Sequence, residues 1–303
     1  MFELDLHRLA VFYTVVNEGT LSKAGDSLYM SQPAISAHIK ALEQQLGVPL
    51  FYRVGRRSVV NKAGEVLYRK AEQLFSVADE LKAEMDELKG MSIGRLNLGA
   101  SVDWQYRLPD DLDKFKQKFP GVELSMNLFT EDRIERLVLD RTLDMGFVGH
   151  VPTRPELVTE HLGDDDLVLI CSRTHRLFKK ARTRPSDLAH EALIVREPDS
   201  AARLVSDEIL ESQNLMDGIS MELGSYEAIK RAVMVGKGVG LVARQSLGAE
   251  IQADLLKVLD VPEMKATIQL HLIYLRDKKM TTSQSAFMEI VAPRTTLATA
   301  VEA

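Results

Sequence analysis

The sequence predicts an N-terminal winged helix-turn-helix that is mainly helical, then a long linker helix, then two α/β subdomains. Three observations predict this order. Apolar residues recur at helical spacing over residues 6–46, and a glycine-centred hairpin follows. A heptad pattern runs over residues 67–88. From residue 95, strand-like apolar runs alternate with helical patterns, which is typical of an α/β fold.

The domain boundaries that follow are 1–61 for the winged helix-turn-helix, 62–90 for the linker helix and 91–303 for the α/β body. Within the body, we expect one subdomain at 91–162 and 266–303 and the other at 163–265.

Within residues 6–46, three short helices are expected in close succession. Gly19 ends the first, Thr20 caps the second, and Ser31 caps a third that has Pro33 in its first turn. Two strand-like runs, 50–53 and 57–60, then flank the turn at Gly55. Three closely linked helices and a two-stranded wing indicate a winged helix-turn-helix, a fold that binds duplex DNA.

The linker helix is expected to begin after Asn61, which can cap it. Its apolar positions alternate by four and three residues. They are Leu67, Ala71, Leu74, Ala78, Leu81, Met85 and Leu88. A seam this narrow normally faces one other helix, so we expect these residues to pair two copies of the chain. The alternative is a helix that packs on its own body.

In the body, strands at 96–100, 122–128 and 144–148 with intervening helices make a βαβαβ unit, which implies a mostly parallel sheet. Strands at 167–172, 192–195 and 219–223, a helix after Ser200 and a helix capped by Ser225 fit a second unit. The strand at 268–275 and the closing helix can return to complete the first unit.

Composition and charge are consistent with this organisation. The chain is 45% hydrophobic and 27% charged, and no segment approaches the roughly 20 apolar residues of a membrane span. No secretion signal is recognisable, so we expect a cytoplasmic protein that does not contact a membrane. The single cysteine, Cys171, lies in an apolar run and is expected to be a buried structural thiol. Residues 1–70 carry a net charge of +3 and the rest −9, which suits an N-terminal module that meets phosphate.

Candidate DNA contacts lie at the start of the third helix and in the wing. Gln32 can make paired hydrogen bonds to adenine, and Pro33 or Ala34 can touch a thymine methyl group. Further candidates point outward or carry positive charge. They are Ser31, Ser36, His38, Lys40, Arg53, Arg56 and Arg57. The alternatives are that Ser31 is only a helix cap and that the arginines form a solvated turn.

The N-terminal residues resemble the DNA-binding domain of LysR-type transcriptional regulators. The matching segments are SQPAISAHIKALE at 31–43, LGVPLF at 46–51, Arg53, GRR at 55–57 and AG at 63–64. Ala37 and His38 stand where many members carry a basic residue, and Asn61 replaces a common threonine. The resemblance implies a non-enzymatic regulator that binds an operator as a homodimer or homotetramer and contacts RNA polymerase.

The same resemblance implies a periplasmic-binding-protein-like body that holds a small-molecule effector between its subdomains and needs no cofactor or metal. The cleft positions it implies follow strands. They are Ser101, Thr130, Gly149, His150, Ser200 and Ser225. Each hydroxyl can instead be a helix cap, and His150 can be a surface histidine. Helix N-termini favour an anionic metabolite such as a carboxylate, but the sequence places no basic residue in the cleft.

The rival functions are an enzyme or a small-molecule-binding α/β protein without a DNA-binding role. Gly236 and Gly238 resemble a phosphate loop, but they follow a helix and precede a strand, so a helix stop is expected. The seven histidines are scattered, and the acidic run 164–166 is expected to be a solvated turn. Neither pattern indicates catalysis.

Overall fold

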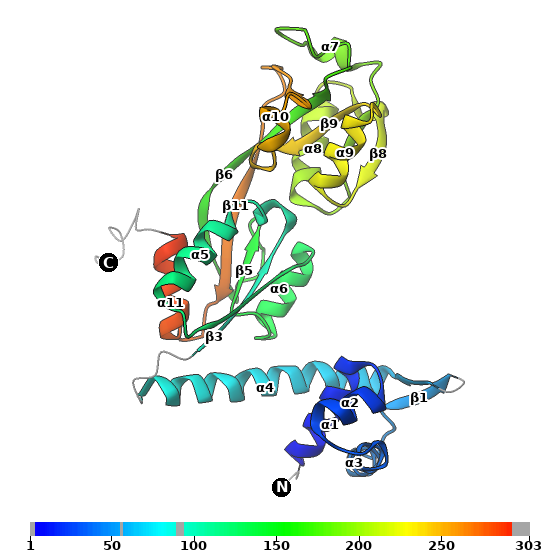
Figure 1. The fold of residues 1–303 in the computed structure, drawn as a ribbon, viewed down its shortest axis with the longest axis vertical. Helices are drawn as coiled ribbons and strands as arrows, with labels where there is room; N and C mark the ends of the chain where they lie inside the picture. Colours follow the sequence, from blue (N-terminus) through cyan, green and yellow to red (C-terminus); the bar gives the residue numbers. More distant parts are fainter. Residues whose placement is uncertain (1–3, 55–56, 89–93, 293–303) are drawn as a thin grey trace. The chain divides into compact units, whose positions relative to one another are not determined.

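The computed structural model describes residues 4–54, 57–88 and 94–292. The chain divides into an N-terminal unit, which extends to Glu84, and a C-terminal unit, which holds nearly all of the rest (Figure 1). Within the described residues, no helix is both long enough and apolar enough to cross a membrane.

The N-terminal unit is a winged helix-turn-helix. Its elements are α1 (Leu6–Glu18), α2 (Leu21–Leu28), α3 (Gln32–Leu46), β1 (Phe51–Val54), β2 (Arg57–Val60) and α4 (Lys62–Leu88). The expected caps are confirmed: the Thr20 and Ser31 side chains accept the amides of Lys23 and Ala34, and Gly19 ends α1 in the left-handed conformation. The Asn61 side chain likewise accepts the amide of Gly64.

The first turns of α4 belong to the core of this unit, and this corrects the expected dimer seam. Ala71 is only 1% exposed and packs with residues of α1 and α3, together with Leu67 and Leu74. The heptad period could not reveal this, because a helix shows the same spacing whether its own domain or a second copy covers it. Ala78, Leu81 and Met85 are exposed, and the Leu88 side chain lies outside the described set.

The C-terminal unit has two lobes. Lobe one contains β3 (Arg95–Ala100), α5 (Leu108–Lys118), β4 (Glu123–Leu128), α6 (Glu131–Leu139), β5 (Met145–Val148) and α11 (Thr282–Val291). Lobe two contains α7 (Pro185–Leu188), β7 (Leu193–Arg196), α8 (Ala201–Ser212), β8 (Ile219–Leu223), α9 (Tyr226–Met234), β9 (Val239–Ala243), α10 (Ala249–Gln252) and β10 (Leu256–Val258). The turns η1 (Val102–Trp104), η2 (Met216–Gly218) and η3 (Arg244–Ser246) are 3-10 helices.

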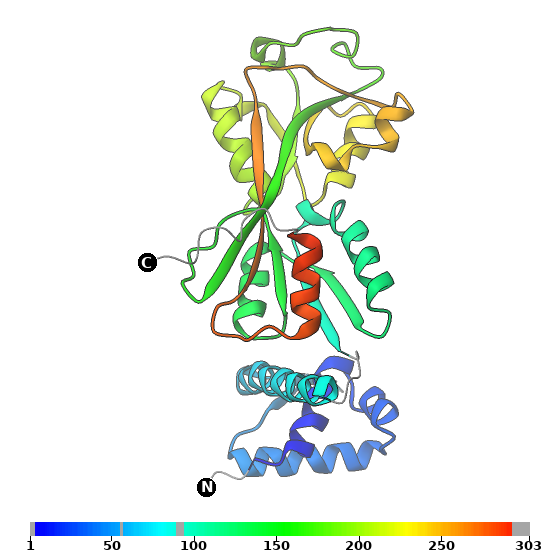
Figure 2. The same ribbon diagram turned by 90° about the vertical axis from the view of Figure 1, so that its left-hand side faces the viewer.

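Two long antiparallel strands, β6 (Leu157–Ser172) and β11 (Ala266–Leu275), run from one lobe to the other (Figure 1, Figure 2). The strands lie in the order β4-β3-β5-β11-β6-β9-β7-β8, and β10 also pairs with β6. β6 starts at Leu157, which is ten residues before the start predicted from the sequence. The acidic run 164–166 lies inside it rather than in a solvated turn, because β11 pairs with these residues.

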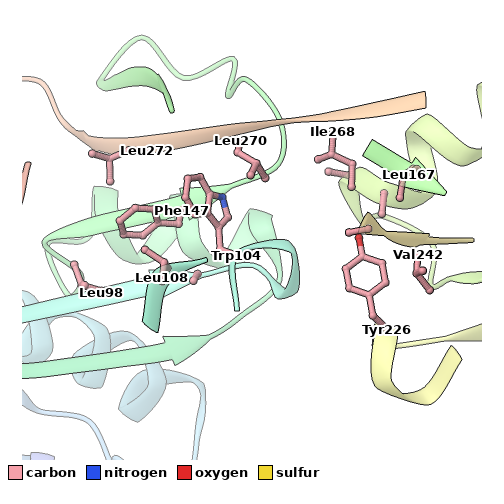
Figure 3. Close-up of a cluster of buried hydrophobic side chains, with 14 of the residues drawn as sticks. Leu98, Trp104, Leu108, Phe147, Leu167, Tyr226, Val242, Ile268, Leu270 and Leu272 are labelled. Carbon is pink, nitrogen blue, oxygen red and sulfur yellow. The ribbon is translucent and has the colours of Figure 1, made fainter. Parts of the chain in front are cut away.

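The largest apolar cluster extends from lobe one into lobe two. In lobe one, the Trp104 ring meets the Phe147 ring edge-on at 4.9 Å, and Tyr226 of lobe two belongs to the same cluster (Figure 3). A second cluster in lobe two contains Cys171, which is fully buried as predicted, and burial raises the pKa of its thiol to about 11. α9 ends before Gly236, whose φ is +76°, so the expected helix stop is confirmed.

Candidate functional site: the recognition helix and the interlobe cleft

The start of α3 presents an exposed polar edge. Ser31, Gln32 and Pro33 are exposed, and Lys40 is exposed two turns further along the helix. Ala34 and Ser36 are half-buried. His38 is also half-buried, and its ring meets that of His7 edge-on at 5.0 Å. Three of the exposed predicted contacts therefore lie at the start of α3, where a recognition helix reads bases.

A groove of about 530 Å³ lies beside this edge, between the start of α2 and the wing. Gln32 lines it together with Thr20, Ser22 and Ser58. The Ser22 hydroxyl donates to Gln32 Oε1 at 3.4 Å. Hydroxyl groups and the α2 N-terminus are typical phosphate contacts. These three hydroxyl residues were missed in the sequence, because only the fold brings α2 and the wing together.

The wing carries the predicted arginines. β1 pairs with β2 in an antiparallel hairpin in which Arg53 is opposite Ser58, and Arg53 is exposed. Arg56 lies outside the described residues, as does the side chain of Arg57. Arg53 is therefore the wing cation whose position supports a contact with a DNA phosphate.

The second site is a cleft of about 680 Å³ between the lobes of the C-terminal unit. It is bordered by residues that follow the carboxyl ends of β3, β4, β7 and β8. Three predicted positions line it: Ser101, Thr130 and Ser200. The carboxyl ends of parallel strands are where α/β folds usually bind ligands, because loops and helix N-termini meet there.

The other three predicted positions do not line the cleft. Gly149 is buried, and its amide donates to Glu131 Oε1 at 2.7 Å. Ser225 caps α9 by accepting the amide of Ala228, and the preceding Gly224 borders the cleft instead. His150 lies between the carboxylates of Glu131 and Glu135. The sequence correctly placed these three residues after strand ends, but it could not show whether they point into the cleft.

Three helix N-termini border the cleft. Thr130 precedes α6, Ser200 caps α8 by accepting the amide of Arg203 at 3.2 Å, and Gly224 lies just before α9. Each N-terminus carries a partial positive charge and amides without helical partners. The cleft thus has the helix geometry that favours an anion.

The cleft also contains a buried arginine that was missed in the sequence. Arg196, at the end of β7, is 3% exposed and lines the cleft. Its Nε and Nη2 each donate to Glu197 at 2.7 Å, and its guanidinium lies 4.7 Å from the centre of the Tyr226 ring. Among the described residues, Nη1 has no hydrogen-bond partner, and it lies 3.6 Å from Asp103 Oδ1. This nitrogen is therefore a buried donor that the described part of the chain leaves unsatisfied, on a residue that lines the cleft.

Four of the acidic residues that line the cleft have partners that either remove their charge or balance it. Burial raises the pKa of Asp103, although the Arg196 guanidinium opposes the rise. The Tyr226 hydroxyl donates to the same carboxyl group. Burial also acts to raise the pKa of Glu197, but its hydrogen bonds from Arg196 hold that pKa below the usual value. Glu131 faces His150. Asp132 pairs with Arg136 at the rim.

Comparison with known proteins gives family matches to both units. The family described as "Bacterial regulatory helix-turn-helix protein, lysR family" matches residues 6–65. The family described as "LysR substrate binding domain" matches residues 89–295.

Among curated proteins, the chain is 30% identical over 289 residues to the transcriptional activator CmpR of Synechocystis sp., covering 95% of each. It is also 30% identical to the transcriptional regulator CbbR of Xanthobacter flavus, covering 94% of this chain and 86% of that protein.

Two solved structures are similar to the chain. Full-length CbnR in complex with its target DNA has a TM-score of 0.74 at 21% identity, and the match covers 95% of this chain and 99% of that one. The regulatory domain of Synechocystis CcmR in complex with 2-PG has a TM-score of 0.60 at 28% identity. That match covers 66% of this chain and 96% of the other.

Proposed function

Because the chain belongs to the LysR family of DNA-binding transcriptional regulators, we propose that α3 reads its operator and that the interlobe cleft binds a small anionic effector. Each role is supported by a different unit of the chain. The recognition edge lies in the N-terminal unit, and the cleft lies in the C-terminal unit.

At the operator, Gln32 contacts base edges and Arg53 contacts phosphate. The exposed first turn of α3 and the adjoining hydroxyl groove support this assignment. The exposed Ala78, Leu81 and Met85 of α4 pair two copies of the chain, so the operator has two half-sites related by dyad symmetry. We also propose that two dimers pair into a tetramer and that the protein contacts RNA polymerase. The protein acts in the cytoplasm, where its DNA is.

The effector is a small anion that also carries hydroxyl groups. The observation that carries this proposal is the buried Nη1 of Arg196. No described residue satisfies this nitrogen, and Arg196 lines a cleft bordered by helix N-termini. Asp132 and Asp199 at the rim can accept hydrogen bonds from hydroxyl groups. The 2-PG complex of the CcmR regulatory domain supports a small ligand in a domain of this kind.

Calorimetric titration of the full chain with 2-PG and with a series of hydroxy acids tests the proposal. We expect at least one of these anions to bind, and Arg196→Gln to reduce its affinity by tenfold or more, since a charge-assisted hydrogen bond is lost. Arg182→Gln is the matched control, because this exposed arginine pairs with Glu263 away from the cleft. Equal affinity in the two variants contradicts the role of Arg196.

A further inference from the structure

His150 lies between two carboxylates of one helix, beside the cleft. Its Nδ1 contacts Glu131 Oε2, and its Nε2 lies 2.8 Å from Glu135 Oε1. Both glutamates are 7% exposed and are four residues apart on α6, so they lie on the same face of the helix. Two buried like charges at this spacing are unfavourable unless a cation lies between them.

Glu131 connects this cluster to the cleft. It is the first residue of α6 and lines the cleft beside Thr130. The charge of Glu131 also helps to raise the pKa of Asp103, so Glu131 acts electrostatically on a second residue that lines the cleft. An anion bound at the N-terminus of α6 therefore meets the field of Glu131, which is repulsive unless His150 balances it.

We propose that His150 is a positioning residue of the effector cleft. Its protonated ring holds Glu131 in place and neutralises its charge, so effector binding depends on a proton. This inference rests on the proposed anionic effector. His150 does not touch the effector in this proposal, because it lies behind Glu131 and does not line the cleft.

The charged groups around His150 favour its protonated form. The hydrogen bond that His150 donates to Glu131 raises the pKa of His150, burial opposes the rise, and Glu135 adds to it. Arg154, 3.6 Å from Glu135, is the opposing cation.

Beyond α6, the neighbouring strands contribute His271 on β11 and His161 on β6, whose rings are 5.3 Å apart. Asp164 accepts from His161. Burial lowers the pKa of His271, and the charges of His161 and His150 lower it further, which favours the neutral form of His271. Of these three histidines, His150 is therefore the one whose charge lies against Glu131.

The direction of the pH dependence follows. Below the pKa of His150 the ring is charged, Glu131 is balanced and the anion binds well. As the pH rises through that pKa, the ring loses its proton and Glu131 repels the anion, so affinity falls. The window lies above the ordinary histidine pKa of 6.5, because the pKa of His150 is raised.

Sulfate is a suitable probe, since its charge does not change between pH 6 and pH 9. Trp104, the only tryptophan, adjoins the cleft residue Asp103 and reports binding through its fluorescence. At fixed ionic strength, we expect the full chain to bind sulfate about tenfold more tightly at pH 6 than at pH 9, an ordinary size for coupling between two sites.

Three variants separate the explanations. His150→Gln should bind sulfate weakly at every pH. His175→Gln should keep the pH dependence, because His175 pairs with Glu191 at 3.0 Å in lobe two, away from the cleft. Glu135→Gln removes one carboxylate, so the fall in affinity should move to lower pH. This last variant tests the idea even if His150→Gln does not fold.

The outcomes are distinguishable. An unchanged pH dependence in His150→Gln, or no movement in Glu135→Gln, overturns the role of His150 and leaves the anion cleft intact. If sulfate does not bind the wild-type chain at any pH, the anion cleft fails and the inference fails with it.

Discussion

Replacing Asp165 with asparagine should stabilise the C-terminal unit at neutral pH. Asp165 lies in β6 and is 4% exposed. Its Oδ1 accepts the amide of Gln245 at 3.3 Å, and its Oδ2 has no hydrogen-bond partner in the part of the chain that the structure describes. Burial raises the pKa of the carboxyl group to about 6, and the charge of Asp103 adds to the rise. Asparagine has the same shape, keeps an acceptor oxygen and removes the buried charge.

The magnitude follows from the difference between the two pKa values. The carboxyl group has a pKa of 3.8 when unfolded and about 6 when folded, so between these values the folded state binds more protons. Stability therefore falls as the pH rises through this window and stays lower above it. The loss is about 1 kcal/mol at pH 4.5 and about 3 kcal/mol at pH 7.5. Asp165→Asn should recover these amounts.

Urea denaturation followed by Trp104 fluorescence measures this difference, because Trp104 lies in the C-terminal unit. The control is Asp166→Asn on the same strand, whose side chain is 60% exposed and whose charge costs little. The reasoning is refuted if Asp165→Asn gains no more stability at pH 7.5 than the control, or if it gains equally at pH 4.5 and pH 7.5. Either result would mean that ionisation of the Asp165 carboxyl group does not destabilise the fold.

The remaining predictions, for four variants, concern the N-terminal unit. Gln32→Ala should relax the preference at one or two base pairs, whereas Arg53→Ala should weaken binding to every sequence and reduce its salt dependence, since one phosphate contact is lost. Mobility shifts on matched and randomised duplexes over a salt series measure both, and wild-type behaviour of both variants contradicts the assigned surface. Ala71→Leu should cost about 1 to 3 kcal/mol in unfolding experiments, because the site is 1% exposed and lies in the apolar core of its unit, where extra methyl groups force neighbours to move. Leu81→Glu, at a site 61% exposed, should leave unfolding unchanged but shift sedimentation toward the monomer, and a stable dimer of this variant would exclude Leu81 from the interface.

The N-terminal fold was predictable because its signals are local. Helix caps such as Thr20 and Ser31 act within three residues of themselves, and the wing needs only one turn. The heptad of α4 was a weaker guide. Its period shows that one face is covered but not what covers it, and Ala71 is covered by its own unit.

The cleft was only partly predictable for the same reason. Ser101, Thr130 and Ser200 were predicted correctly as cleft residues because they follow strand ends. In a parallel sheet, the carboxyl ends of the strands lie at the same edge. Arg196 was missed because it ends an apolar strand, where a charged side chain needs partners that are distant in sequence, such as Asp103. Asp165 was assigned to a turn because the apolar run that predicted the strand begins at Leu167, whereas β6 begins at Leu157.

The central claim is that the interlobe cleft binds an anion through Arg196. Crystals of the full chain grown with selenate test it directly, because anomalous scattering locates selenium. The account predicts a selenium peak in the cleft beside Thr130 and Ser200, placed so that a selenate oxygen lies within hydrogen-bond distance of Arg196 Nη1, and no such peak in crystals of Arg196→Gln. A cleft without selenate in the wild-type crystal, or a peak that persists in the variant, would contradict it.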